Sequence, residues 1–176
     1  MTYATVADLA RPSDRTRAIA YDVAAVLAGS LLMALCAQIA FRLPFAPLVP
    51  VTMQTFGVLV LGMLLGPARG TAAVVAYLAE GLIGLPVFAQ GALGAAYMAG
   101  PTGGYLVAFV PAVWLVGTLA RRGWDRSVAR TLLAMALGTA VIFAGGWAWL
   151  VCLTGSATVA FAGGVVPFLP GAVVKV

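Results

Sequence analysis

Few residues of this 176-residue chain combine a chemically useful side chain with a position inside an apolar run. They are Gln38, Gln54, Glu80 and Lys175. A polar group within a hydrophobic span is costly, and it is therefore a functional candidate by default. Histidine is absent from the sequence, which excludes histidine general bases, histidine metal sites and histidine proton relays.

Glu80 and Lys175 are the charged members of this set. Glu80 is the only acidic residue between Asp22 and Asp125, and Tyr77 shares its helical face three residues back. Two interpretations of Glu80 fit: it lines a ligand pocket, or it packs in protonated form against a neighbouring helix. Lys175 is the only lysine. Either it binds a carboxylate, helped by the positive end of its helix, or it extends to the membrane interface.

A glycine-rich turn and two cysteines are the remaining candidates for chemistry. The turn Gly100-Pro101-Thr102-Gly103-Gly104-Tyr105 resembles a phosphate-binding loop only superficially, because no Walker lysine follows it. The chain therefore lacks the means to hydrolyse ATP, and energised transport would require another subunit. Cys36 and Cys152 lie in apolar runs, where a free thiol behaves as a small hydrophobic group.

The elements that position these residues are transmembrane helices. Hydrophobic residues make up 63% of the chain and charged residues 9%, whereas a soluble domain has about 25% charged residues. A spanning helix needs about 20 mostly apolar residues. The sequence predicts an all-α integral membrane bundle of about six helices, with spans near 18–40, 52–65, 71–85, 105–119, 128–153 and 167–176. The last span is short, which indicates a truncated sixth helix or a half-helix. We expect a polar cytoplasmic tail over 1–17 and a single transmembrane substrate-binding domain over 18–176.

The basic residues predict the orientation of the chain. Under this topology one side of the membrane carries only Arg42, and the other carries eight arginines: Arg11, Arg15, Arg17, Arg69, Arg121, Arg122, Arg126 and Arg130. Because positive residues favour the cytoplasmic side, we expect a multi-pass protein of the bacterial cytoplasmic membrane with a cytoplasmic amino terminus. The net charge of +5 thus reflects orientation rather than a nucleic-acid-binding patch.

Three long connections rich in glycine and proline fall together on the outer side, over 41–53, 86–104 and 154–168. Irregular backbone near a membrane is tolerated where it packs on protein or lines a wet cavity. Together these connections predict a cup that opens outward and captures a small molecule. The alternative interpretation is a set of ordinary surface loops.

A stripe of small residues runs along the first span, comprising Ala20, Ala24 and Ala28. Small residues at this spacing allow another helix to approach closely. The stripe serves either a partner subunit or the chain's own bundle, and the sequence does not distinguish the two.

Four stretches together resemble the BioY family, the biotin-specific S components of energy-coupling factor (ECF) transporters. They are Val49-Pro50-Val51-Thr52-Met53-Gln54-Thr55-Phe56-Gly57, Gly84-Leu85-Pro86-Val87-Phe88-Ala89, Gly100-Pro101-Thr102-Gly103-Gly104-Tyr105, and Pro167-Phe168-Leu169-Pro170-Gly171 with Lys175 four residues on. They occur in the order and spacing of the family. Two positions depart from the family pattern: Ala172 stands in place of an aspartate, and Gln90 in place of the first of two glycines.

The resemblance implies high-affinity biotin binding in an outward-facing pocket and biotin uptake, without catalysis or a cofactor. It implies a transmembrane coupling subunit and two ATP-binding subunits as partners, although some members work without them. The expected substrate-binding residues are Thr52, Gln54, Tyr77, Glu80, Phe88, Tyr105 and Lys175, and the expected partner interface is Ala20, Ala24 and Ala28. The alternatives are an S component for another vitamin and an intramembrane enzyme that uses Glu80.

Overall fold

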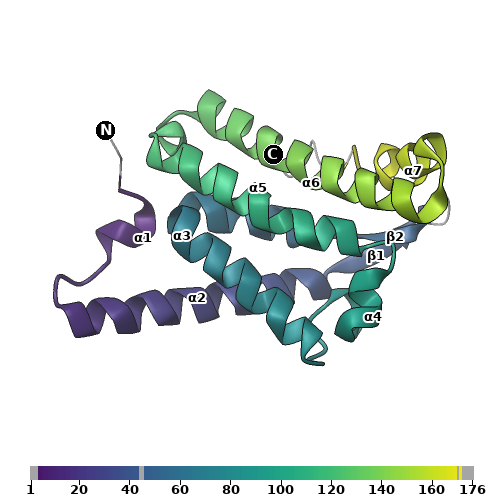
Figure 1. The fold of residues 1–176 in the computed structure, drawn as a ribbon. Helices are drawn as coiled ribbons and strands as arrows, with labels where there is room; N and C mark the ends of the chain where they lie inside the picture. The colour runs from purple at the N-terminus through teal and green to yellow at the C-terminus, as the bar shows by residue number, and fades with distance from the viewer. Residues whose placement is uncertain (1–3, 44–45, 170, 172–176) are drawn as a thin grey trace.

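Four long apolar helices form the body of the protein. The computed structural model describes residues 4–43, 46–169 and 171. Within this part of the chain, the helices long and apolar enough to cross a membrane are α2 (Arg15–Gln38), α3 (Gln54–Leu82), α5 (Gly103–Arg121) and α6 (Val128–Thr154). They pack in the order α2, α3, α5, α6 (Figure 1). The predicted helical membrane bundle is confirmed.

Helix α3 is a hairpin of two antiparallel arms rather than one straight rod. Gly66 has φ 76° and ψ −177°, a left-handed conformation that breaks the helix, and Pro67 follows it. Gln54 Nε2 donates a hydrogen bond to Tyr77 Oη at 2.7 Å, 23 residues further on. A straight helix would separate these residues by about 34 Å. The two arms, 54–65 and 67–82, agree with the predicted second and third spans and with the predicted turn between them (Figure 1).

The short elements gather at one end of the bundle (Figure 1). They are β1 (Ala40–Leu43), β2 (Ala46–Thr52), the 3-10 helix η1 (Ala89–Gly91), α4 (Gly94–Ala99), α7 (Ala157–Gly164) and the 3-10 helix η3 (Val166–Phe168). β1 and β2 pair antiparallel, with Phe41 opposite Val51. The prolines of 41–53 predict only the absence of a regular helix. A two-stranded ribbon accommodates Pro50 because each of its strands has an unpaired side.

The segment after α6 differs from the prediction of a loop. Residues 157–164 form α7, whose N-cap Ser156 accepts a hydrogen bond from the Val159 backbone N–H. The sequence predicts a long connection over 154–168, and α7 lies within it. Of the predicted sixth span, 167–176, only Pro167, Phe168, Leu169 and Gly171 belong to the described residues.

The arginine-rich end of the bundle lies opposite the short elements. Arg69 lies next to Gly66-Pro67, which form the vertex of the α3 hairpin. It contacts Asp8 of α1 (Val6–Leu9) at 2.8 Å and Asp22 of α2 at 2.6 Å. Arg11 pairs with Asp22 at 2.8 Å. Burial alone would raise the pKa of Asp8, but hydrogen bonds from Thr5 and Arg69 hold it below its ordinary value. Part of the predicted 1–17 tail therefore packs against the vertex, and α2 begins at Arg15.

The same arrangement places the basic ends of the other helices together. An added Cβ on Gly66 would lie 3.4 Å from Arg121 Nε at the end of α5. The 3-10 helix η2 (Trp124–Arg126) joins α5 to α6 at this end. The arginines that the sequence predicts on one side of the membrane thus lie at one end of the structure.

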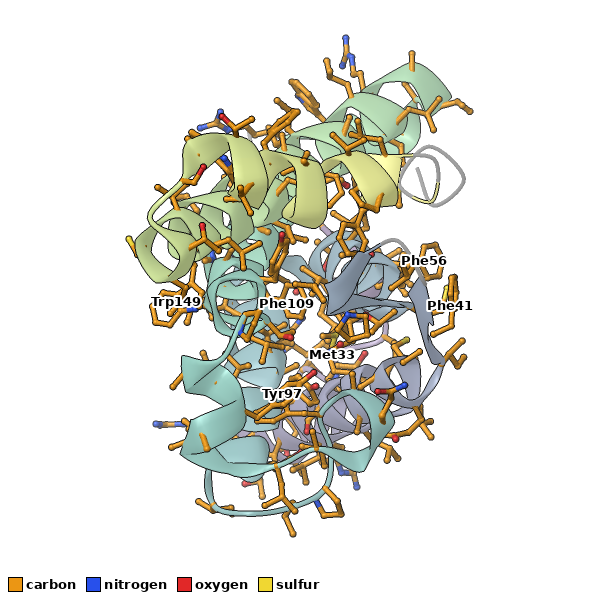
Figure 2. The ribbon with its side chains drawn as sticks, turned by 90° about the vertical axis from the view of Figure 1, so that its right-hand side faces the viewer. Met33, Phe41, Phe56, Tyr97, Phe109 and Trp149 are labelled. Atoms are coloured by element: carbon orange, nitrogen blue, oxygen red, sulfur yellow. The ribbon has the colours of Figure 1, made fainter. Side chains whose placement is uncertain are left out.

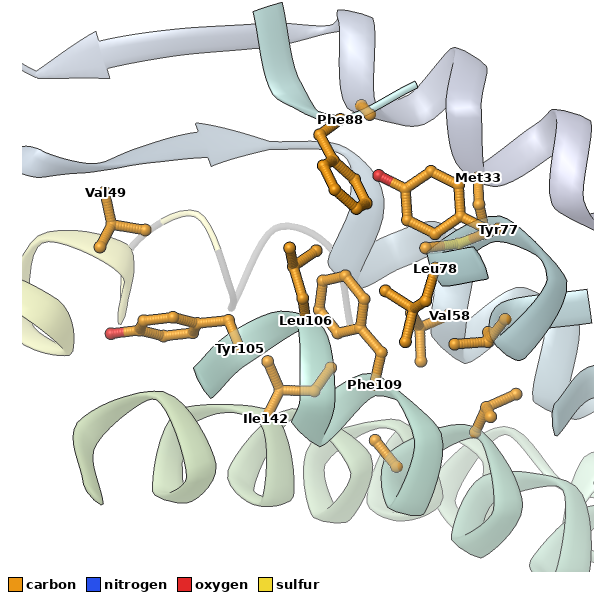
Figure 3. Packing of buried hydrophobic residues seen from close by; sticks show 14 of the residues in the cluster. Met33, Val49, Val58, Tyr77, Leu78, Phe88, Tyr105, Leu106, Phe109 and Ile142 are labelled. Carbon is orange, nitrogen blue, oxygen red and sulfur yellow. The ribbon is translucent and has the colours of Figure 1, made fainter. Parts of the chain in front are cut away.

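The largest buried cluster lies between the α3 hairpin, α5 and α6. Figure 3 shows Val58 and Tyr77 of α3 beside Phe109 of α5, with Ile142 of α6 on the other side of α5. These four side chains are all at least nine-tenths buried. The cluster extends to Val49 of β2 and to Phe88 (Figure 3), so the core continues from the helices into the short elements.

Candidate functional site

A pocket lies where the short elements meet the helix ends. Its described lining comes from β2, the start of α3, the first half of α5, α6 and η3: Val49, Pro50, Val51, Thr52, Gln54, Thr55, Thr102, Tyr105, Phe109, Thr139, Phe143 and Phe168. Val49 lies above Tyr105 and Phe109 in Figure 3. Residues of all three long connections therefore meet at this pocket.

Apolar side chains make most of the pocket wall. Phe143 and Phe168 approach each other with ring centroids 6.5 Å apart, and Tyr105 and Phe168 at 6.4 Å. Figure 2 views the bundle from this end, with Phe109 between the helices and Phe41 and Phe56 at the outer edge. The described lining contains no charged side chain. The site therefore suits a largely apolar molecule with a few polar groups.

Thr52 and Gln54 form a polar edge of this pocket. The Thr52 hydroxyl donates to Gln54 Oε1 at 3.1 Å, and the Gln54 backbone N–H donates to the Thr52 hydroxyl at 3.3 Å. Gln54 is 2% exposed. Both residues are brought there by the transition from β2 into α3. Both Thr52 and Gln54 are predicted site residues, and both line the pocket.

Tyr105 also lines the pocket, from the first turn of α5. Its hydroxyl donates to the Gly164 carbonyl at 2.5 Å, which ties α7 to α5. Gly146 and Gly164 provide space for this side chain, since a Cβ on either would meet the Tyr105 ring or hydroxyl. Tyr105 thus contributes a ring to the wall and joins two of the elements that build it.

Tyr77 and Phe88 lie behind the polar edge rather than in the lining. The Tyr77 hydroxyl contacts Gln54 at 2.7 Å and donates to the Val87 carbonyl at 3.2 Å. Phe88 is fully buried, with its ring edge-on to Tyr77 at 5.6 Å. The ring fills the space left by the missing side chain of Gly81. Phe88, expected to bind substrate, is part of the core and is not among the described pocket-lining residues.

Glu80 does not belong to the described pocket lining. Its carboxylate accepts a hydrogen bond from the Ser30 hydroxyl of α2 at 2.5 Å. Of the two interpretations left open by the sequence, the structure supports contact with a neighbouring helix. The helical spacing that joins Glu80 to Tyr77 does not bring it to the pocket, because Tyr77 itself points to Gln54 and Val87.

Three pocket threonines, Thr55, Thr102 and Thr139, were not identified as site residues from the sequence. Thr102 precedes α5 and is 8% exposed, and its carbonyl accepts hydrogen bonds from the Tyr105 and Leu106 backbone N–H groups. Thr139 lies inside α6 and donates to the Met135 carbonyl of its own helix at 2.9 Å. A threonine bonded to its own helix is common in apolar spans, so Thr139 carries no signal. Thr102 lies in the stretch Gly100-Pro101-Thr102-Gly103-Gly104-Tyr105, of which only Tyr105 was predicted as a site residue.

The remaining predicted residues divide between exposed and undescribed positions. Ala20, Ala24 and Ala28 are exposed on α2, whereas the adjacent Gly29 is buried against α3. The stripe is therefore not used for packing within the described bundle. Lys175 and the nearby Ala172 lie outside the described residues.

Comparison with known proteins gives one consistent result. The BioY family model matches residues 8–176. The chain is 36% identical over 161 residues to a biotin transporter BioY of Rhizobium etli, covering 87% of this chain and 85% of that protein. It is 39% identical over 127 residues to a protein of Pyrococcus horikoshii named as a probable biotin transporter BioY, covering 72% and 74%.

A solved structure shares the fold. It is the crystal structure of the S-component for biotin from an ECF-type ABC transporter, with a TM-score of 0.78 and 27% sequence identity. The match covers 93% of this chain and 88% of that one.

Proposed function

Because this chain belongs to the BioY family, we propose that it binds biotin in the pocket beside Thr52 and Gln54 and is the substrate-specific subunit of a biotin uptake system. The observation that carries the proposal is an apolar pocket with a buried polar edge, located where β2 enters α3. The named relatives are transporters and not enzymes. The names of these relatives therefore argue against the alternative of an enzyme that uses Glu80. The Glu80 side chain, moreover, bonds to Ser30 of α2.

The chemistry of biotin matches this pocket part by part. Its fused rings and valerate chain are apolar and suit the aromatic wall of Phe109, Phe143 and Phe168. Its ureido group offers N–H donors and a carbonyl acceptor to the amide and hydroxyls of the polar edge. Its carboxylate requires a cation, and we assign that role to Lys175, which follows Phe168 by seven residues in the sequence.

Replacing Gln54 by alanine is expected to weaken biotin binding about tenfold, which corresponds to ~1.4 kcal/mol, because one buried hydrogen-bonding group is lost. The measurement is equilibrium binding to purified protein in detergent, with thiamin and riboflavin as competitors. Thr118→Ala is the control, since the Thr118 hydroxyl bonds to the Trp114 carbonyl of its own helix, away from the pocket lining. Equal losses for both variants would remove Gln54 from the site. If the unmodified protein selectively bound another vitamin, that vitamin would replace biotin as the proposed substrate.

We further propose that the exposed stripe of α2 contacts a transmembrane coupling subunit that works with two ATP-binding subunits. Ala20, Ala24 and Ala28 are all exposed, which leaves a surface of small side chains available for close helix packing. The arginine-rich end near Arg69 would face the cytoplasm, because positive residues favour that side. This orientation places the pocket at the outer face, where biotin would enter.

The partner surface makes its own prediction. Ala24→Leu is expected to abolish co-purification with the coupling subunit, because the larger side chain holds the helices apart, while biotin affinity stays within twofold. Ala144→Leu serves as the control, since Ala144 is an exposed alanine on α6. Co-purification of Ala24→Leu at the level of the control would contradict the assignment of this surface.

A further inference from the structure

Behind the polar edge, a chain of hydrogen bonds runs from the pocket to the segment after α3. Thr52 bonds to Gln54 Oε1 at 3.1 Å, Gln54 Nε2 to Tyr77 Oη at 2.7 Å, and Tyr77 Oη to the Val87 carbonyl at 3.2 Å. Gln54 is 2% exposed and Tyr77 fully buried, so water does not compete freely for these bonds.

The Val87 carbonyl determines the direction of the whole chain of bonds. A backbone carbonyl can only accept, so the single phenolic proton of Tyr77 is donated to it. The Tyr77 oxygen is then left as an acceptor for its other neighbour, and the Gln54 atom 2.7 Å away must be the NH₂ group. The carbonyl oxygen of the Gln54 amide consequently lies on the side of Thr52, which lines the pocket, whereas Tyr77 does not.

Tyr77 is itself held in place by rigid neighbours. The Phe88 ring packs edge-on against it at 5.6 Å and stacks on Tyr97 at 5.4 Å. Gly81 leaves the space that the Phe88 ring occupies. The Phe88 carbonyl also accepts a hydrogen bond from Gln38 Nε2 at 3.2 Å. The segment that carries Val87 and Phe88 is thus anchored to both α2 and α3.

We propose that Tyr77 is a positioning residue that orients the Gln54 amide so that an acceptor, and not a donor, faces the ligand. The pocket edge therefore selects a molecule that presents an N–H group at this point, as the ureido ring of biotin does. This inference rests on the proposed function for the identity of the ligand. Without the Tyr77 hydroxyl, the buried NH₂ group loses its partner, and the amide is no longer held in one of its two orientations.

The test combines a double-mutant cycle with a readout that needs no ligand. Tyr77→Phe is expected to weaken biotin about fivefold in the otherwise unmodified protein and to cause no further loss in Gln54→Ala, because Tyr77 acts through Gln54. Tyr105→Phe is the matched control: it also removes a buried hydroxyl that donates to a backbone carbonyl, that of Gly164. The fold-losses of biotin affinity caused by Tyr105→Phe and by Gln54→Ala are expected to multiply in the double variant.

The ligand-independent readout is the side-chain amide spectrum of protein labelled with ¹⁵N-glutamine. The glutamines are Gln38, Gln54 and Gln90, so Gln54→Ala assigns the signal. Tyr77→Phe is expected to shift the Gln54 NH₂ pair and to remove its protection from exchange. An unchanged Gln54 signal, or losses that multiply in the Tyr77–Gln54 cycle, would overturn the role of Tyr77. A perturbed signal in a protein that ignores biotin would instead refute the proposed function and retain the positioning role.

Discussion

Replacing Gly117 by leucine is expected to destabilise the fold by about 3 kcal/mol or more, the upper range for overpacking a core. A Cβ at this position of α5 would lie 2.5 Å from the Pro67 nitrogen and 2.6 Å from the Gly66 carbonyl carbon. These are backbone atoms of the α3 vertex. They have little freedom to move, because Thr5 and Arg121 also pack against Gly66.

Thermal unfolding of the purified protein in detergent checks this expectation. A change of this size corresponds to a fall in the unfolding midpoint of roughly 6–12 °C. The neighbouring Thr118→Leu is the control, since the Thr118 hydroxyl bonds to the Trp114 carbonyl of its own helix. If both variants melt together, the vertex is able to yield, and the close approach of α5 to the α3 hairpin does not support the fold as described.

Replacing Thr139 by phenylalanine is expected to reduce biotin affinity at least about a hundredfold, or ~2.8 kcal/mol. Thr139 faces the pocket from α6 and is 8% exposed. Because its hydroxyl bonds to the Met135 carbonyl of the same helix, removing it breaks no contact between helices. A phenyl group in its place would occupy the space proposed for the apolar part of biotin.

Equilibrium binding, with yield and thermal unfolding measured in parallel, separates a blocked pocket from a damaged fold. Leu137→Phe is the control on the same helix, at a position that is 40% exposed. It is expected to bind biotin like the unmodified protein. Undiminished affinity in folded Thr139→Phe would place the ligand elsewhere in the molecule.

The candidate site was only partly accessible from the sequence. Thr52, Gln54 and Tyr105 could be assigned because they lie in motifs shared with the BioY family, and the structure brings all three to one pocket. Glu80 was included because charge inside a membrane usually signals function. That rule identifies a residue that needs a partner, and here the partner is Ser30 of α2.

More of the fold than of the site could be predicted from the sequence, because the patterns that indicate the fold involve residues close together in the chain. Long apolar runs predict spans wherever they occur, and Gly66-Pro67 predicts a break wherever it interrupts one. The pairing of β1 with β2 was not predicted. The prolines of this segment indicate that a regular helix is absent, but they do not indicate which structure forms instead. The small helix α7 was missed since its short run of small residues resembles a loop.

The sequence by itself determined the membrane class, the hairpin break at Gly66, the family membership and the end of the bundle where the connections meet. Each of these follows from residue types that are neighbours in the chain or from short ordered motifs. Only the tertiary structure decided that Tyr77 stands behind Gln54, that Phe88 packs into the core, and that the stripe of Ala24 is exposed. Those facts depend on contacts between residues far apart in sequence, and the helical period of a single segment does not specify which neighbour each face meets.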